Sequence, residues 1–173
     1  MPVIFHAVQK LLNTSRLKTV QYVSKGAEGQ LLHSWYATLL NTGFSGKLLV
    51  MYVHEPSLLT VVCRGKTIGG TWEEFLGRLP ALLKKAGFPE KQIEWEISLM
   101  DSYVVAKTSS RSMRSYMTQM MLVFEGPYAS YEGILLERLE ENILDYPYST
   151  PGKAKRYNTA GDYWREYWSA QHL

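Results

Sequence analysis

The stretch of sequence that decides the fold runs from Gly46 to Arg64 and reads GKLLVMYVHEPSLLTVVCR. Two apolar runs, Leu48–Val53 and Leu58–Cys63, flank the four polar residues HEPS. Both runs are rich in β-branched residues, and the proline between them cannot donate a hydrogen bond to a strand ladder. The pattern therefore predicts a β-hairpin with a four-residue loop. Because neither run alternates with polar residues, we expect both strands to be buried on both faces, at the centre of a sheet.

The remaining elements follow from local patterns on either side of this hairpin. Short apolar runs predict further strands over residues 3–8, 31–40 and 103–106. Helical spacing of apolar residues predicts helices over about 71–86, 109–124 and 131–146. We expect Thr71 to cap the first of these helices and Pro80 to kink or divide it.

Together these elements predict an α+β fold in which a small sheet with a central hairpin (46–64) is covered by several helices. We expect residues 1–147 to form a single domain, and residues 148–173 to form a basic linker and an aromatic helical tail. The methionines Met113, Met117 and Met120 recur at helical spacing and are expected to lie in the core.

The composition is that of a globular protein, because hydrophobic residues make up 46% of the 173 residues and charged residues 20%. A net charge of +3 allows a local basic patch but does not by itself indicate a nucleic-acid-binding protein. The single cysteine, Cys63, excludes an internal disulfide, and a thiol in a buried strand is typical of a reducing compartment. No apolar run reaches the ~20 residues of a membrane helix, and the first residues do not resemble a signal peptide. We therefore expect a cytoplasmic protein without a membrane partner.

The clearest binding chemistry lies where the strand predicted over 103–106 leads into the next helix. The residues there are Lys107, Thr108, Ser109, Ser110, Arg111 and Arg114. Free N–H groups and the helix dipole attract anions to such a place, and an arginine can hold a phosphate or carboxylate through two parallel hydrogen bonds. In the alternative interpretation, one serine is an ordinary helix cap and Arg111 pairs with a nearby acid.

The histidines and the cysteine give no sign of a metal or catalytic site. His6, His33, His54 and His172 have no metal-ligand spacing, so the sequence predicts neither a metal nor a cofactor, and no residue is assigned to catalysis. His54, at the tip of the predicted hairpin, is expected to be exposed. Cys63 lacks a CxxC partner and is expected to be a small buried residue without chemistry.

Four aromatic residues, Tyr163, Trp164, Tyr167 and Trp168, lie on the short helix predicted at the end of the chain. Two interpretations are open. Either these side chains dock on the body of their own domain, or they form an exposed aromatic patch that binds a protein partner.

Several short motifs, in a fixed order, resemble those of a family of small bacterial proteins, the domain of unknown function numbered 6933. They are Lys10-Leu11-Leu12, Trp35-x-Ala37-x-Leu39, the buried hairpin, Phe75 with Leu79-Pro80, and Lys107-Thr108-x-x-Arg111-Ser112 followed by Met117. The resemblance covers about residues 3–146. The chain departs from the family pattern at Arg114-Ser115, Thr118 and His54. The resemblance implies an α+β fold and a bacterial or phage cytosol, and it brings no known activity.

These observations favour a non-enzymatic binding or regulatory protein of a bacterium or a mobile element. We expect it to bind a macromolecular or phosphate-bearing partner, nucleic acid being one candidate, through residues 107–114. Two alternatives remain open. One is an enzyme acting on a nucleotide or phosphoester, with Lys107 and Arg111 holding the anion and a carboxylate or His54 as base. The other is a protein-interaction module that uses the aromatic tail.

Overall fold

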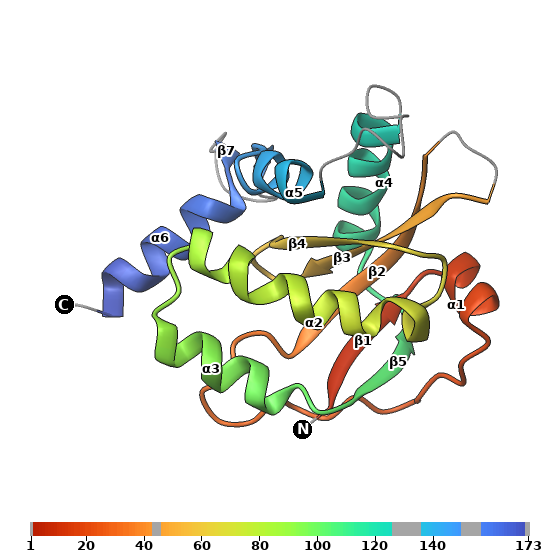
Figure 1. Ribbon diagram of the computed structural model, residues 1–173, viewed down its shortest axis with the longest axis horizontal. Coiled ribbons are helices and arrows are strands. Elements are labelled where there is room, and N and C mark those ends of the chain that lie inside the picture. The colour runs from red at the N-terminus through yellow and green to blue at the C-terminus, as the bar shows by residue number, and fades with distance from the viewer. Residues whose placement is uncertain (1, 43–45, 126–135, 150–156, 172–173) are drawn as a thin grey trace.

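A five-stranded mixed sheet packed between helices forms the body of the protein (Figure 1). The computed structural model describes residues 2–42, 46–125, 136–149 and 157–171. The strands of the sheet are β1 (Val3–Ala7), β2 (Ser34–Asn41), β3 (Leu48–His54), β4 (Thr60–Arg64) and β5 (Tyr103–Lys107). The helices are α1 (Gln9–Ser15), α2 (Ile68–Lys85), α3 (Glu90–Leu99), α4 (Arg111–Glu125), α5 (Leu136–Leu144) and α6 (Ala160–Gln171). A two-stranded ribbon pairs β6 (Tyr148–Ser149) with β7 (Tyr157–Asn158).

The α+β fold class and the single domain are confirmed, but the hairpin does not lie at the centre of the sheet. The strand order is β4-β3-β2-β1-β5, so β2 is central and β4 is an edge strand. Strands β2, β3 and β4 are antiparallel neighbours, whereas β1 runs parallel to both β2 and β5. The apolar runs of the hairpin indicate only that both faces of its strands are covered by helices. An edge strand can be covered on both faces as well as a central one, so the runs do not indicate the position of the hairpin in the sheet.

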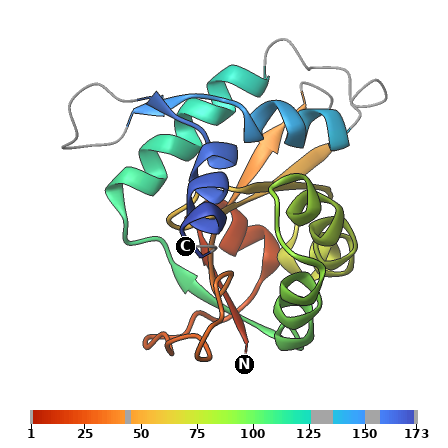
Figure 2. The ribbon, with the colours of Figure 1, turned by 90° about the vertical axis from the view of Figure 1, so that its left-hand side faces the viewer.

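Two hydrophobic cores lie on opposite faces of the sheet, and Figure 2 shows α4 on one side and α2 with α3 on the other. The larger core contains a cluster of rings in which Phe5 lies 4.8 Å from Tyr52 and 5.3 Å from Phe75. The second core contains Met113, Met117 and Met120, so the predicted core position of the methionines is confirmed. Alternate side chains of β2 and β3 enter each core. Burial of apolar side chains on both faces therefore fixes the sheet relative to the helices on either side.

The start of α2 differs from the sequence-based expectation. Thr67, four residues before the predicted cap, accepts a hydrogen bond from the Gly70 N–H at 3.0 Å. Thr71 lies inside the helix and is buried, and its hydroxyl is 2.5 Å from that of Tyr52. The helix also continues through Pro80, because a missing N–H removes only one of its many hydrogen bonds. The glycines at 69 and 70 therefore belong to the first turn and not to the preceding loop.

Helix α6 is packed against the body of the domain through Trp164, which is only 2% exposed. The Trp164 ring lies 4.5 Å from Phe88 and 5.9 Å from His54. Tyr163, Tyr167 and Trp168 are partly buried against the same core. The predicted linker cations Lys153, Lys155 and Arg156 lie outside the described residues, as do Tyr131 and Leu135.

Candidate anion-binding site

The candidate site lies at the carboxyl ends of the parallel strands β1 and β5. These strands pair along their full length, from Val3 opposite Tyr103 to Ala7 opposite Lys107. From β1 the chain passes through α1 to β2 on one side, while β5 lies on the other side of β1. Where connections leave neighbouring parallel strands in opposite directions, the ends of the strands are left open, and ligands commonly bind there.

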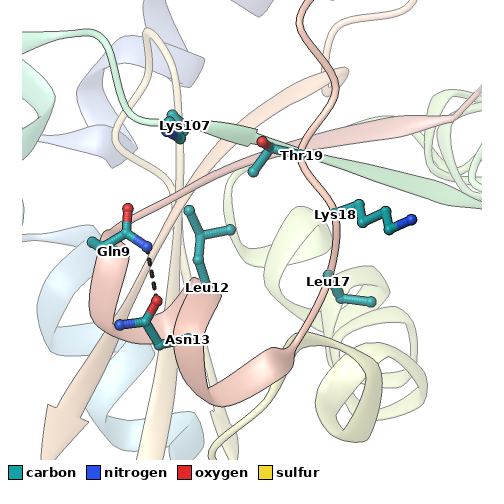
Figure 3. A pocket seen from close by; sticks show the side chains of 7 residues that line it. All are labelled: Gln9, Leu12, Asn13, Leu17, Lys18, Thr19 and Lys107. Atoms are coloured by element: carbon teal, nitrogen blue, oxygen red, sulfur yellow. Dashed lines mark hydrogen bonds between the residues drawn. The ribbon is translucent and has the colours of Figure 1, made fainter.

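Two adjoining hollows open at this edge of the sheet, and they share Thr19 and Lys107 as walls. We call the two together the trough. The first hollow, of about 450 Å³, is lined by Gln9, Leu12, Asn13, Leu17, Lys18, Thr19 and Lys107 (Figure 3). The second, of about 420 Å³, is lined by His6, Thr19, Val20, Gln21, Val23, Ala106, Lys107 and Ser109. Lys107 thus lies where the two hollows meet.

The polypeptide around the trough is unusually basic for a chain of such modest net charge. Residues 1–54 contain five lysines or arginines and a single acidic residue, Glu28. Residues 102–124, which form β5 and most of α4, contain three and no acidic residue. Strand pairing between β1 and β5 brings these two segments together. These two segments together carry a net positive charge, and the Glu55 carboxylate, one residue beyond the first of them, also acts on His6 at the trough.

The strand–helix junction, residues 107–114, has the geometry of a capped helix start. The Ser110 hydroxyl accepts a hydrogen bond from the Met113 N–H at 3.3 Å, so the predicted serine cap is confirmed. The N–H groups of Arg111 and Ser112 belong to the first turn, which has no acceptors within the helix. Arg111 and Arg114 are exposed, and within the described part of the chain no ion pair joins either of them or Lys107 to a carboxylate. The junction therefore presents both free cations and helix N–H groups.

A stacked pair of rings, His6 and Tyr36, lies beside the junction with centroids 4.7 Å apart. Burial lowers the pKa of His6, against the opposing effects of the Lys107 main chain and the Glu55 carboxylate. Burial likewise raises the pKa of Tyr36, whose hydroxyl hydrogen-bonds with Ser109 and Ser110. At neutral pH both rings are therefore uncharged, and they hold the start of α4 in place against the sheet.

The structure brings together some of the predicted site residues and separates others. Lys107 and Ser109 line the trough, whereas Arg111 and Arg114 follow on α4 and are not among the lining residues. Thr108 is half-buried between them. The aromatic residues of the tail lie on α6, at the opposite end of the sheet, as Figure 1 shows. The two regions proposed from the sequence thus do not form one surface.

Sequence reasoning missed the second wall of the trough, formed by residues 17–23. No strand, helix or site was predicted for this segment. In the structure the segment lies along β5, where the Val20 N–H donates to the Val105 carbonyl oxygen at 2.8 Å. The available signal was charge, since residues 16–25 contain three basic residues and no acidic one.

The expectation that His54 is exposed is wrong, because this residue is 1% exposed. Its Nδ1 lies 2.7 Å from the Ser57 hydroxyl, and its Nε2 lies 2.9 Å from the Leu31 carbonyl oxygen. Burial lowers the pKa of His54 to about 3. The residue lies at the end of β3, away from the trough, so it cannot be the base of a phosphoester-cleaving site there.

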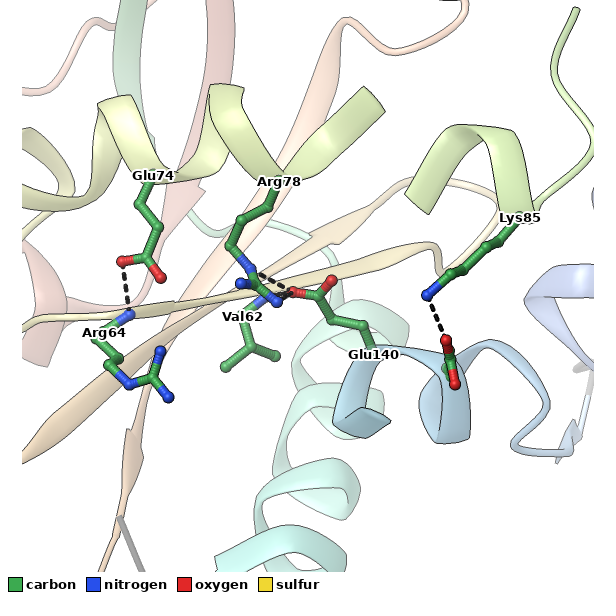
Figure 4. A network of polar contacts seen from close by, with 7 residues as sticks. Val62, Arg64, Glu74, Arg78, Lys85 and Glu140 are labelled. Atoms are coloured by element: carbon green, nitrogen blue, oxygen red, sulfur yellow. Dashed lines mark hydrogen bonds and ion pairs between the residues drawn. The ribbon is translucent and has the colours of Figure 1, made fainter. Parts of the chain in front are cut away.

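A separate polar cluster joins α2, β4 and α5, and its role is structural (Figure 4). The Glu140 carboxylate accepts hydrogen bonds from the Val62 N–H at 3.3 Å and from Arg78 Nε at 2.7 Å. Glu74 accepts from the Arg64 N–H at 3.0 Å, and Lys85 pairs with Glu141. Each carboxylate bonds with groups of its own fold, so this cluster connects the helices to the sheet.

Two other kinds of structural feature are absent from the described ranges. No group of three or more histidine, cysteine, aspartate or glutamate side chains is placed to hold a metal ion there. Among the same residues, no helix combines the length and the apolar character needed to cross a membrane.

Comparison with known proteins identifies one related family. The model of the family described as Domain of unknown function (DUF6933) matches residues 4–163, which confirms the resemblance drawn from the motifs. The match runs from β1 into α6, beyond the residue 146 expected from the motifs, and it includes the whole strand–helix junction. No curated protein and no solved structure matches the chain.

Proposed function

We propose that this chain, which belongs to the DUF6933 family, is a non-enzymatic binding protein that holds a phosphate-bearing partner in the trough. The observation that carries the proposal is the position of Lys107. It stands between the two hollows, at the start of the junction that also bears Arg111 and Arg114.

The chemistry of these groups favours phosphate over other ligands. An ammonium group binds a phosphate as a point charge, and a guanidinium binds it through two parallel hydrogen bonds. The first-turn N–H groups of α4 add donors that the helix itself does not use. Because no described carboxylate pairs with Lys107, Arg111 or Arg114, an incoming anion does not have to displace an acidic side chain.

The lining of the trough supports binding more than hydrolysis. Apart from the His6 imidazole, its polar side chains are amides, hydroxyls and lysines, which position and neutralise an anion but do not transfer protons at neutral pH. His6 is the one imidazole among the described residues of the lining, and no carboxylate is among them to act with it. General acid–base catalysis places its acid and base within hydrogen-bond reach of the reacting atoms.

Titration calorimetry with inorganic tripolyphosphate tests the proposal. We expect Lys107→Ala and Arg111→Ala each to weaken binding by about 1.5–3 kcal/mol, the range for a hydrogen bond to a charged group. Binding by the natural protein should weaken steeply as salt is added. Thermal stability should change by less than about 1 kcal/mol in either variant, because both side chains are exposed.

The matched control is Lys84→Ala, which removes an exposed cation at the far end of α2 and should leave binding unchanged. If Arg111→Ala lowered stability sharply and left tripolyphosphate binding intact, Arg111 would be a structural residue, and the proposal would be wrong.

A further inference from the structure

We infer that the phosphate-bearing partner is a single-stranded nucleic acid, with its backbone along the trough and a base stacked on Tyr22. This inference rests on the proposed function and specifies its ligand. Three independent features of the described residues carry it: the shape of the site, an exposed ring beside it, and the distribution of charge.

The shape of the site is that of an open channel. The two hollows follow one another from Gln9 and Asn13 on α1, past Lys107, to Val23 and Ser109. Both are open to solvent. The first is lined mainly by polar residues, and the second by polar residues together with Val20, Val23 and Ala106. A compact ligand needs an enclosed pocket that buries most of its surface, whereas a flexible strand follows an open groove with a repeated phosphate.

The exposed ring is that of Tyr22, which is 90% exposed. Gln21 and Val23, on either side of Tyr22, line the trough, while Tyr22 itself is not among the lining residues. The Val20 N–H is bonded to β5, so the backbone that carries the ring lies at the trough wall. Val20 and Val23 are themselves 37% and 44% exposed. An isolated exposed aromatic ring on a basic groove is the element on which proteins stack unpaired bases.

The charge around Tyr22 fits a polyanion. Lys18 and Lys25 flank the ring, both exposed, and no acidic residue lies between positions 16 and 25. Lys18 lines the trough from residues 17–23 and Lys107 lines it from β5, and the arginines follow Lys107 on α4. A single strand passing between them would offer phosphates to the cations and unpaired bases to Tyr22, whereas a duplex keeps its base faces stacked inside.

Fluorescence anisotropy with an end-labelled, mixed-sequence oligonucleotide tests this inference, using the strand alone and the same strand annealed to its complement. We expect the single strand to bind at least about tenfold more tightly than the duplex. Tyr22→Ala should weaken single-strand binding by about fivefold to a hundredfold, the effect of losing one stacked base, and Tyr22→Phe should retain it. The matched control is Trp95→Ala, which removes a ring 46% exposed on α3 and should have no effect.

The outcomes separate this inference from the function on which it rests. If Lys107→Ala weakened binding but Tyr22→Ala did not, or if duplex and single strand bound equally, the proposed phosphate site would be supported and the assignment of a single-stranded ligand would be wrong. If tripolyphosphate and both oligonucleotides failed to bind, the proposed function would fall with it. Equally tight binding of a labelled polyglutamate peptide would also overturn the assignment, because it would show attraction to any polyanion.

Discussion

The burial of His54 makes the stability of this protein depend on pH in a way that can be measured at one residue. The imidazole is enclosed by the rings of Trp35 and Trp164, and both of its nitrogens are engaged, with the Ser57 hydroxyl and the Leu31 carbonyl oxygen. Desolvation therefore lowers its pKa from 6.5 to about 3. In the unfolded chain His54 becomes protonated near pH 6.5, whereas in the folded protein it stays neutral at that pH. The stability contributed by neutral His54 is therefore present above pH 6.5 and is lost progressively below it.

The size of the effect follows from proton linkage. Each pH unit between the two pKa values costs about 1.4 kcal/mol of unfolding free energy. Between about pH 7.5 and about pH 4.5, His54 alone should therefore remove roughly 2–3 kcal/mol from the stability of the natural protein. His54→Gln keeps a polar side chain but carries no titrating group. We expect the variant to be less stable at neutral pH, by about 1–3 kcal/mol, and the difference to shrink as the pH falls.

Urea unfolding of both proteins at a series of pH values measures this difference directly. Groups that titrate in both proteins, such as the buried Glu96 carboxylate whose pKa is raised by burial, cancel in the comparison. Ser57→Ala serves as the control, because it removes the partner of Nδ1 without removing the imidazole, and its curve should run parallel to that of the natural protein. Parallel curves for His54→Gln as well would refute the reasoning, since they would mean that His54 gains its proton normally in the folded state.

Two further predictions concern other buried side chains. Trp164→Ala should cost about 3–5 kcal/mol in a urea melt, because it removes a fully buried ring from the core; a loss within experimental error would mean that α6 contributes nothing to the fold. Cys63→Ala should cost about 1 kcal/mol. The Cys63 thiol should react only slowly with a thiol reagent in the native protein, because burial raises its pKa; rapid native labelling would contradict its buried position.

The strands could be predicted from the sequence because their signal is local. The runs at 3–8, 31–40 and the two halves of the hairpin each became strands. The hairpin loop lies over residues 55–59 instead of the expected 54–57, because β3 includes His54 and β4 begins at Thr60. The order of the strands could not be predicted in the same way. Strand β1 pairs with both β2 and β5, which lie about 30 and 100 residues away in the sequence. No local sequence pattern indicates which distant segments will pair.

The candidate site likewise contains residues that a local sequence signal predicts and residues that no local signal predicts. The junction with its Ser110 cap was predictable, because a strand followed by serines and an amphipathic pattern is a local signal. Residues 17–23 lacked such a signal, since they reach the site only through the edge of β5. His54 was misjudged for a related reason. A histidine beside a turn is usually exposed, and here Leu31 and Trp164, both distant in sequence, cover it.

The polar cluster on β4 has a consequence for how this protein behaves at high concentration. An edge strand with free N–H groups invites another chain to pair with it and is a starting point for aggregation. On β4, the N–H groups of Val62 and Arg64 are already bonded to the carboxylates of Glu140 and Glu74, so these groups are not available to a second molecule. At the opposite edge, the main-chain hydrogen bond from residues 17–23 to β5 is the one donated by the Val20 N–H. Intermolecular strand pairing should therefore begin at β5. Pairing at β4 should occur only in acid strong enough to protonate the carboxylates of Glu74 and Glu140.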